Sequence, residues 1–301
     1  MNYAIESEDL FFAYSAGKHV LSGINIQVKQ GEVFGLLGPN GAGKTTFVKT
    51  LLDFVRPQRG RLLLLGLPPQ QLNRVGIAYL PERQAIPRFL TAREFLIYQS
   101  RLAGLARNEI PVEIDRVLAA VKIEEHRNSR IETFSKGMLQ RLGLAQALLG
   151  SPRLLLLDEP NSGLDPIGVM DIRSVLLAEK ERGATIFINS HRLLEVEQLC
   201  DSFAILNQGK VIAGGSRDDL SSRRGIELEL EETTPEILAH LRQLDAALRI
   251  KDRRIELTIS DPELERLFPG QLVAMGARIN YYARKKESLE EVFRRTVEEQ
   301  S

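Results

Sequence analysis

The sequence contains one cysteine, and its formal charges cancel. Cys200 has no partner for an internal disulfide and no Cys or His cluster around it. It is therefore expected to be a small buried apolar residue in a reducing compartment. Lys and Arg number 40, as do Asp and Glu. This balance provides no general attraction to nucleic acid or to an acidic membrane, so no nucleic-acid partner is expected.

Long apolar runs and a secretion signal are also missing. The longest apolar runs, such as Leu62–Leu65 and Leu154–Leu157, fall far short of the roughly 20 residues that span a bilayer. The start of the chain carries Glu6, Glu8 and Asp9 and lacks the basic and apolar regions of a signal peptide. If the protein serves a membrane, another chain is expected to supply the membrane part.

The composition, 43% hydrophobic and 27% charged over 301 residues, indicates a soluble protein of about two domains. Short apolar runs alternate with helical stretches in the first part, which predicts a mostly parallel sheet covered by helices. Val33–Leu37 leads through a glycine-rich turn into a helical stretch at Thr45–Asp53. Leu154–Leu157 and Thr185–Asn189 lack alternation, as expected for strands buried on both faces.

A helical insert is predicted from about residue 85 to residue 150. This segment is rich in Leu, Ala, Glu and Arg at helical spacing. Thr91 and Glu94 have the spacing of a capping box, which predicts that a helix starts there.

A polar linker, Ser221–Gly225, separates a first domain at residues 1–220 from a second at 225–301. The predicted order of elements is strand–helix–strand–strand–helix–strand plus a last helix, which suggests a small α+β domain of ferredoxin-like type. The segments behind this order are strands at Ile226–Glu231 and Arg254–Ile259, helices at Pro235–Leu244, Pro262–Leu272 and Ser288–Glu298, and an extended stretch at Ala277–Ala283.

Residues 38–46 match the P-loop pattern, with a predicted strand before them and a helix after them. The glycines let several N–H groups point at one anion, and the helix adds its positive end. Lys44 would supply a charge for the β- and γ-phosphates, and Thr45 a hydroxyl for Mg²⁺. A turn that only caps a helix is the alternative, and the complete pattern argues against it. The residues predicted to bind nucleotide here are Gly38, Pro39, Asn40, Gly41, Ala42, Gly43, Lys44, Thr45 and Thr46.

Two acids, Asp158 and Glu159, end the buried strand at Leu154–Leu157. In P-loop enzymes the first acid at such a strand end holds Mg²⁺, usually through water, which gives that role to Asp158. Glu159 is then placed to orient or deprotonate the attacking water. A solvated turn is the alternative, but the P-loop requires a partner of this kind.

Further segments resemble the ABC ATPase family, in the family's order. Phe134–Arg141 resembles the signature motif, usually Leu-Ser-Gly-Gly-Gln, and places Ser135 and Gly137 at a helix start that would grip a second anion. Taken alone, this segment would be read as an ordinary Ser-capped helix, and the order of the motifs favours the signature. Ser162–Asp165 resembles the D-loop, which makes Asp165 a nucleotide-site candidate.

Two single residues extend the resemblance. His191 matches the histidine that contacts the γ-phosphate, and Tyr14 lies where the family places an aromatic ring that stacks on adenine. Phe12 is a second candidate for the stacking ring, and a plain strand residue is the alternative for Tyr14. The resemblance covers roughly residues 3 to 220 and implies a P-loop core with an antiparallel β flank and a helical subdomain.

The sequence also departs from the common family pattern. Glu82, in Tyr79-Leu80-Pro81-Glu82, stands where many members have Gln, and as an acceptor only it could hold Mg²⁺ or water. Lys136 and Met138 replace Gly and Gln in the signature, and Asn161 stands where Thr is common. The variants at Leu80–Glu82 and Ser135–Met138, together with the tail Ser288–Phe293, resemble a prokaryotic export-type subgroup that pairs the ATPase with a separate permease.

The resemblance therefore implies an ATP-hydrolysing subunit that uses ATP and Mg²⁺ to drive an integral membrane permease. Lys44, Glu159 and His191 are the expected catalytic residues, and Thr45, Asp158 and Glu82 the expected metal ligands. The signature of one subunit completes the ATP site of another in this family, so a second ATPase subunit in a homodimer is the other expected partner. The permease would dock after Glu82 and on Ala85–Leu105, which implies a cytoplasmic location on the inner face of the cell membrane.

Three other functions were compatible with parts of the pattern. An importer ATPase is disfavoured by Glu82 and the C-terminal tail. A non-transport ABC ATPase of DNA repair or translation usually has a long coiled-coil insert or two ATPase domains, and neither is evident here. A nucleotide-binding regulator without hydrolysis is disfavoured by the presence of Glu159 and His191.

Overall fold

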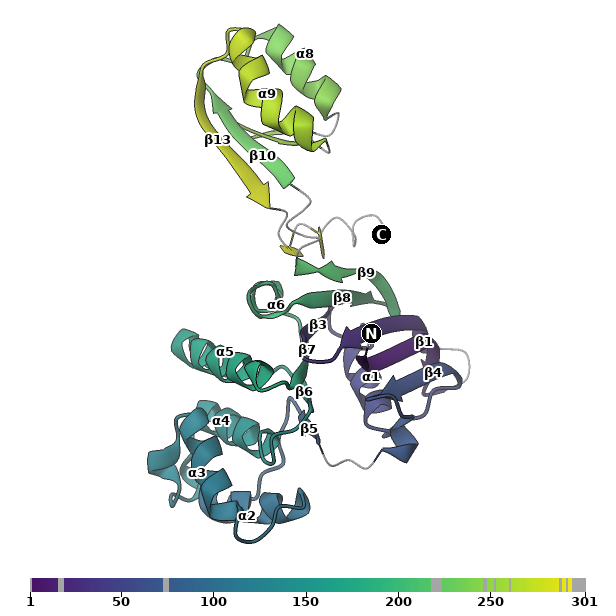
Figure 1. Ribbon diagram of the computed structural model, residues 1–301, viewed down its shortest axis with the longest axis vertical. Coiled ribbons are helices and arrows are strands. Elements are labelled where there is room, and N and C mark those ends of the chain that lie inside the picture. The colour runs from purple at the N-terminus through teal and green to yellow at the C-terminus, as the bar shows by residue number, and fades with distance from the viewer. Residues whose placement is uncertain are drawn as a thin grey trace. The chain divides into compact units, whose positions relative to one another are not determined.

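The computed structural model describes residues 2–15, 19–72, 76–217, 224–245, 248–251, 253–259, 261–286, 289–290 and 292–293. The chain forms two compact units, Met1–Gly214 and Gly215–Ser301, and Figure 1 labels most of their helices and strands. Residues 221–223 of the predicted linker and most of the predicted last helix at Ser288–Glu298 lie outside the described residues. Arg224 and Gly225 do not belong to a linker, because they begin a strand.

A six-stranded sheet forms the centre of the first unit, in the order β5-β6-β7-β3-β8-β9. The four pairings from β5 to β8 are all parallel. Every residue of β3, β6 and β7 is buried, which explains the uninterrupted apolar runs of the sequence. The strands are β3 (Val33–Leu37), β5 (Ile77–Leu80), β6 (Leu154–Asp158), β7 (Thr185–Ser190), β8 (Ser202–Asn207) and β9 (Lys210–Ser216).

An antiparallel β flank packs against one face of this sheet together with helix α1 (Lys44–Leu51). The flank has the order β2-β1-β4, formed by β1 (Tyr3–Ala13), β2 (His19–Lys29) and β4 (Arg59–Leu64). One continuous core joins the flank to the sheet, with Phe47 of α1 packed 6.0 Å from the ring centroid of Phe187 on β7. The opposite face is covered by α5 (Pro166–Glu181) and α6 (Leu193–Leu199), as Figure 1 shows.

The helical part of the first unit comprises α2 (Ala92–Leu102), α3 (Ile110–Ala120) and α4 (Lys136–Ala147), with short 3-10 turns at Glu124–His126 and Ile131–Thr133. Another such turn, Pro69–Gln71, follows β4. The predicted capping box at Thr91 and Glu94 is confirmed, because both of its reciprocal hydrogen bonds are present at the start of α2. The predicted helix at Thr45–Asp53 begins one residue earlier and ends two residues earlier in the structure, and α4 begins directly after Ser135, at the helix start predicted there.

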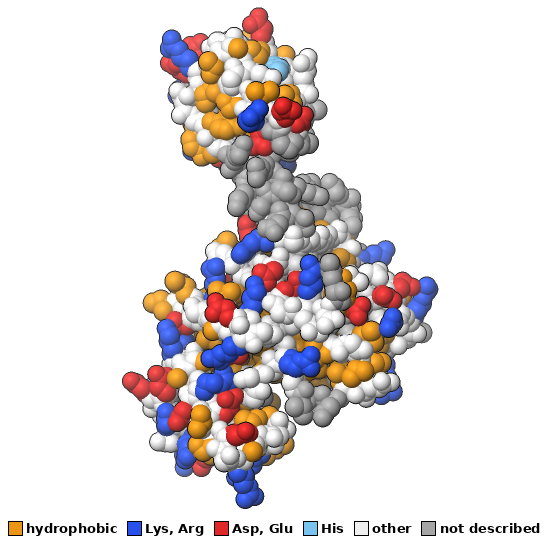
Figure 2. All heavy atoms as spheres, viewed as in Figure 1, with side chains coloured by type: hydrophobic (Ala, Val, Ile, Leu, Met, Phe, Trp, Pro, Cys, Tyr) orange, Lys and Arg blue, Asp and Glu red, His pale blue; other side chains and the backbone are white. Residues whose placement is uncertain are grey.

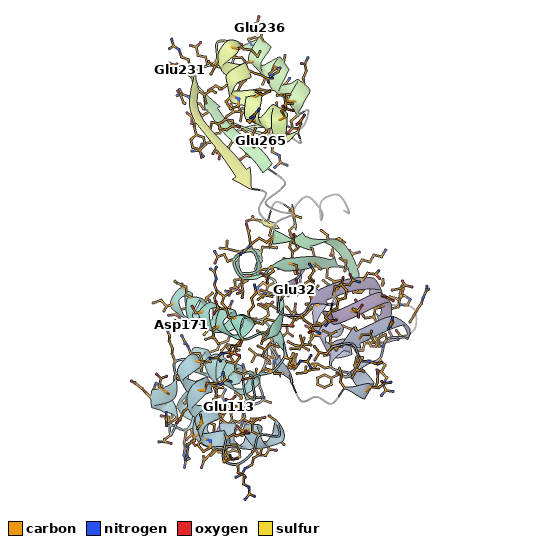
Figure 3. All side chains as sticks on the ribbon, viewed as in Figure 1. Glu32, Glu113, Asp171, Glu231, Glu236 and Glu265 are labelled. Carbon is orange, nitrogen blue, oxygen red and sulfur yellow. The ribbon has the colours of Figure 1, made fainter. Side chains whose placement is uncertain are left out.

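Ion pairs tie this helical part to α5. Arg116 of α3 contacts Glu179 at 3.1 Å and also pairs with Glu113, while Arg141 of α4 contacts Asp171 at 2.8 Å. Glu113 and Asp171 are labelled in Figure 3, on α3 and α5 respectively. Glu179 is buried, and ion pairs with Arg116 and Arg182 compensate its charge. Removing Arg116 would leave this buried charge less compensated, so the contact between α3 and α5 depends on that pair.

The second unit has a four-stranded antiparallel sheet in the order β11-β12-β10-β13, with α8 and α9 on one face. This order is the ferredoxin-like arrangement that the sequence pattern suggested. Strand β11 had no segment assigned to it from the sequence, because three residues are too few to show alternation. The elements are β10 (Arg224–Leu230), α8 (Pro235–Leu244), β11 (Arg249–Lys251), β12 (Arg254–Thr258), α9 (Pro262–Ala274) and β13 (Ile279–Lys286).

Candidate functional site

The phosphate-binding pattern forms the turn between β3 and α1. Gly38 has a φ of 154°, and a Cβ there would lie 2.1 Å from the backbone oxygen of Leu206. Gly43 caps α1 with a φ of 108°, where a Cβ would lie 2.8 Å from the oxygen of Val20. Only glycine allows the loop to curl this tightly against β8 and β2, which leaves the helix N-terminus directed into the site.

Lys44 occupies the centre of the site. Its side chain is folded back over the loop, with Nζ donating to the backbone oxygens of Gly38 at 2.7 Å and Pro39 at 3.2 Å. The residue is only 7% exposed. Burial lowers the pKa of the ammonium group, and the nearby carboxylates of Glu159, Asp158 and Glu82 act in the opposite direction. The structure therefore brings together the lysine and all three acids that the sequence singled out.

Asp158, at the end of β6, is a buried carboxylate with two other acids and a single lysine near it. Burial, together with repulsion from Glu159 and Glu82, raises its pKa to about 6. A 2.6 Å hydrogen bond from Asn189 Nδ2 and the charge of Lys44 only partly offset this effect. Asn189 was not predicted to contact the site, because its register opposite Asp158 depends on the pairing of β6 with β7.

Glu159 and His191 form a hydrogen-bonded pair at the same edge of the sheet. Glu159 Oε1 lies 2.7 Å from His191 Nδ1 and accepts a hydrogen bond from the His191 backbone N–H at 3.0 Å. The backbone of Glu159 has a φ of 50°, a left-handed conformation that a residue with a side chain adopts only when its surroundings enforce it. The carboxylate is thus held in a fixed orientation by the residues that follow β7.

Burial distinguishes the two aromatic candidates for stacking on a base. Phe12 is 6% exposed and belongs to the core, whereas Tyr14 is 58% exposed. The Tyr14 ring packs edge-on against Phe12, and its hydroxyl lies 3.5 Å from Thr46 Oγ1. Tyr14 therefore stands at the end of the P-loop with most of its ring accessible, and Phe12 does not.

The signature and D-loop residues adjoin each other and make no direct hydrogen bond to the P-loop among the described residues. The side chains of Ser135 and Asp165 cap α4 and α5, respectively. A Cβ on Gly137 would lie 3.4 Å from Leu164, so the two motifs are neighbours. Within the part of the chain that the structure describes, no hydrogen bond or ion pair joins Ser135, Gly137 or Asp165 to residues 38–46.

The geometry defines the class of protein, a P-loop nucleotide-binding protein with two acids beside the loop lysine. A family model described as "ABC transporter" matches residues 21–162. The bacitracin transport ATP-binding protein BcrA of Bacillus licheniformis is 40% identical over 238 residues, covering 77% of this chain and 76% of that protein. The Nod factor export ATP-binding protein I of Rhizobium etli is 38% identical over 220 residues, covering 72% and 69%.

A solved structure shares the fold as well. The structure of cbiO1 from Clostridium perfringens, described as part of the ABC transporter complex cbiONQ, has a TM-score of 0.66 and 28% identity. The match covers 81% of this chain and 96% of that one. This chain therefore belongs to the ABC transporter family as an ATP-binding subunit, and like the members of that family it is an ATPase. Among the described residues, no helix has both the length and the apolar character needed to cross a membrane.

The pKa of Asp158 generates a stability prediction. Its folded-state pKa, about 6, exceeds the ordinary value of 3.8, so its favourable contribution is complete below pH 3.8 and is lost as the pH rises through 6. Replacing Asp158 with Asn should stabilise the nucleotide-free protein, and by about 1 kcal/mol more at pH 8 than at pH 5. Calorimetric unfolding at the two pH values measures this difference.

Asp171→Asn is the matched control, because hydrogen bonds from Lys122 and Arg141 lower the pKa of Asp171. That variant should lose stability to a similar extent at both pH values, since Asp171 is ionised throughout this range. An Asp158→Asn gain that does not grow between pH 5 and pH 8 would contradict the charge imbalance described above.

Proposed function

We propose that this chain binds Mg–ATP between the P-loop and Asp158 and Glu159, and that its ATP hydrolysis drives a separate membrane permease as an exporter. The observation that carries the proposal is the buried Lys44 facing the acids at the end of β6. The direction of transport is supported by the relative from Rhizobium etli, which is named for export.

The residues of the site suit a triphosphate bound with a divalent cation. Three carboxylates, those of Asp158, Glu159 and Glu82, interact with the single ammonium group of Lys44, which leaves excess negative charge. Among the described residues, no group of three His, Cys, Asp or Glu side chains is close enough to hold a metal ion alone. This fits Mg²⁺, which is usually bound by one or two carboxylates, waters and substrate phosphates.

Asp158, Glu82 and the exposed hydroxyl of Thr45 would hold the cation. When bound, Mg²⁺ would neutralise charge on the phosphate oxygens. The loop N–H groups and Lys44 would bind the phosphates, and Tyr14 would stack on the adenine ring. Glu159 would orient the attacking water and accept its proton, as a new bond forms to the γ-phosphorus and the bond to ADP breaks. His191 holds the Glu159 carboxylate and would contact the γ-phosphate.

A homodimer is supported by the position of Ser135, Gly137 and Asp165. No hydrogen bond or ion pair among the described residues connects them to the P-loop of their own chain. This agrees with the composite site that the family resemblance implies, in which a second copy brings the signature to the nucleotide. ATP would favour the closed dimer because its γ-phosphate makes contacts that ADP lacks.

The permease would dock on the surface that follows Glu82. Large apolar side chains of this region, Phe89, Tyr98 and Leu102, are exposed, although apolar groups are usually buried. Figure 2 shows acidic and basic side chains interspersed over the visible face of the first unit. The implied location is cytoplasmic, at the inner face of the cell membrane.

Replacing Lys44 with Ala should weaken ATP binding and reduce phosphate release by about a hundredfold or more, because a buried positive charge facing the phosphates is lost. Lys49→Ala, one turn further along α1, is the control and should retain the wild-type rate. A Lys44→Ala protein that hydrolyses ATP at a near-normal rate would exclude the P-loop as the nucleotide site.

Replacing Glu159 with Gln should leave ATP binding intact, nearly abolish hydrolysis and trap a dimer that is visible by size-exclusion chromatography with ATP. The amide keeps the shape of the carboxylate but cannot accept a proton from water. Glu124→Gln, in an exposed 3-10 turn, is the control. Free turnover by Glu159→Gln would assign the base to another residue.

Replacing Leu102 with Glu should release the chain from membranes that contain its permease, because a charge would be buried at the docking surface. Val112→Glu on α3 is matched in exposure, 73% against 66% for Leu102, and should remain membrane-bound. Sedimentation of membranes followed by immunoblotting measures both. Equal retention of the two variants would place the docking surface elsewhere.

A further inference from the structure

Helix α4 carries a buried amide whose bonds reach the catalytic turn. Gln140 is 5% exposed, and its Nε2 donates to the backbone oxygen of Pro160 at 2.8 Å and to that of Glu159 at 3.4 Å. Among the described residues, no other side chain donates a hydrogen bond to either carbonyl. An amide buried this deeply is favourable only if it is hydrogen-bonded, so these contacts are specific.

Gln140 is hydrogen-bonded to the turn that follows β6, in which Glu159 adopts its left-handed conformation. The Glu159 N–H donates to the oxygen of Asn189 at 2.9 Å, which fixes the turn to β7. Its carbonyl accepts from Ser162 N at 3.0 Å, within the turn itself. Gln140 supplies the third restraint, and it is the one that comes from the helical part of the unit. Such a conformation persists only where its surroundings over-determine it.

A second amide extends the contact toward the nucleotide-facing acids. Gln84 Nε2 donates to Gln140 Oε1 at 3.1 Å. The Gln84 amide lies directly on Gly143, where a Cβ would come within 2.0 Å of its Oε1. Gln84 stands two residues after Glu82, which interacts with Lys44 and Asp158. The two amides thus connect the segment after β5, helix α4 and the turn after β6.

Helix α4 is also the helix that Ser135 caps, and Gln140 lies on it five residues further along. An α-helix is stiff over this length, so a displacement of its first turn also moves Gln140. Through the Pro160 carbonyl, the displacement reaches the peptide that carries Glu159.

We propose that Gln140 is a positioning residue for ATP hydrolysis, which fixes the turn that carries Glu159 and makes the placement of that carboxylate depend on helix α4. The proposal rests on the proposed role of Glu159 in activating water. Gln140 itself acts through Glu159 and has no direct contact with the reacting atoms.

The test compares Gln140→Glu and Gln140→Leu with wild type in steady-state ATP hydrolysis by the full chain. The carboxylate has the size of the amide but cannot donate to Pro160. We expect kcat to fall by about tenfold to a hundredfold in both variants, because the reacting group is displaced. The KM and the Kd for Mg–ATP should change by less than about twofold, since the P-loop is untouched. Gln146→Leu on the same helix is the control and should match wild type.

Two further variants keep the result interpretable. If Gln140→Leu does not fold, Gln84→Leu removes the donor to Gln140 Oε1 from outside α4, and it should also reduce kcat without raising KM. The double variant Glu159→Gln/Gln140→Glu should hydrolyse ATP no more slowly than Glu159→Gln alone, because both substitutions act on one group.

The outcomes separate the two hypotheses. If Glu159→Gln abolishes turnover while folded Gln140→Glu and Gln140→Leu retain the wild-type kcat, the positioning role of Gln140 is wrong and that of Glu159 stands. If Glu159→Gln retains turnover, the proposed role of Glu159 is wrong and the positioning role of Gln140 falls with it. A rise in KM equal to the fall in kcat/KM would also overturn the proposal, since it would show lost nucleotide binding instead of misplacement.

Discussion

The site depends on buried charges of opposite sign that are brought together where three parallel strands end. Strands β6, β7 and β3 are adjacent, so the residues after Asp158, Ser190 and Leu37 emerge at one edge of the sheet. Lys44 is buried there, and the nearby carboxylates offset the free-energy cost of burying its charge. The acids in turn outnumber the lysine, which explains why the pKa of Asp158 is raised. The imbalance favours a ligand that brings its own cation.

The turn after β6 connects this charge cluster to the rest of the unit. Gln140 reaches it from α4, and His191 reaches it from the residues that follow β7. Asn189 of β7 donates to Asp158, the last residue of β6. Asn161, two residues after Glu159, donates to Glu195 of α6 at 2.9 Å. This hydrogen bond joins the turn to α6, the helix that follows His191. The helical part and the sheet are therefore joined at the residue proposed to activate water.

Much of the fold could be predicted because its signals are local. Strands β3, β6 and β7 form largely apolar runs because both of their faces are covered. The capping box at Thr91 depends on two residues of the same helical turn, Thr91 and Glu94. The residues of strand β11 could not be assigned from the sequence, although the predicted order included a strand there, because three residues show no periodicity and their pairing with β12 supplies the structure. The contact of Gln140 with Pro160 left no sequence signal beyond the motif, since it joins residues on different elements.

The sequence by itself determined the chemical groups of the site: a glycine-rich loop with its lysine, two acids at a strand end, a histidine after the next strand, and a tyrosine and a phenylalanine as candidates for a base-stacking ring. Only the tertiary structure decided which of these groups meet. It buried Phe12 and left Tyr14 exposed, paired Glu159 with His191, and kept Ser135 from any hydrogen bond to its own P-loop among the described residues. The reason is physical: residue types and turn geometry are fixed by neighbours in the chain, whereas burial and charge pairing depend on strand order and on packing between segments far apart in sequence.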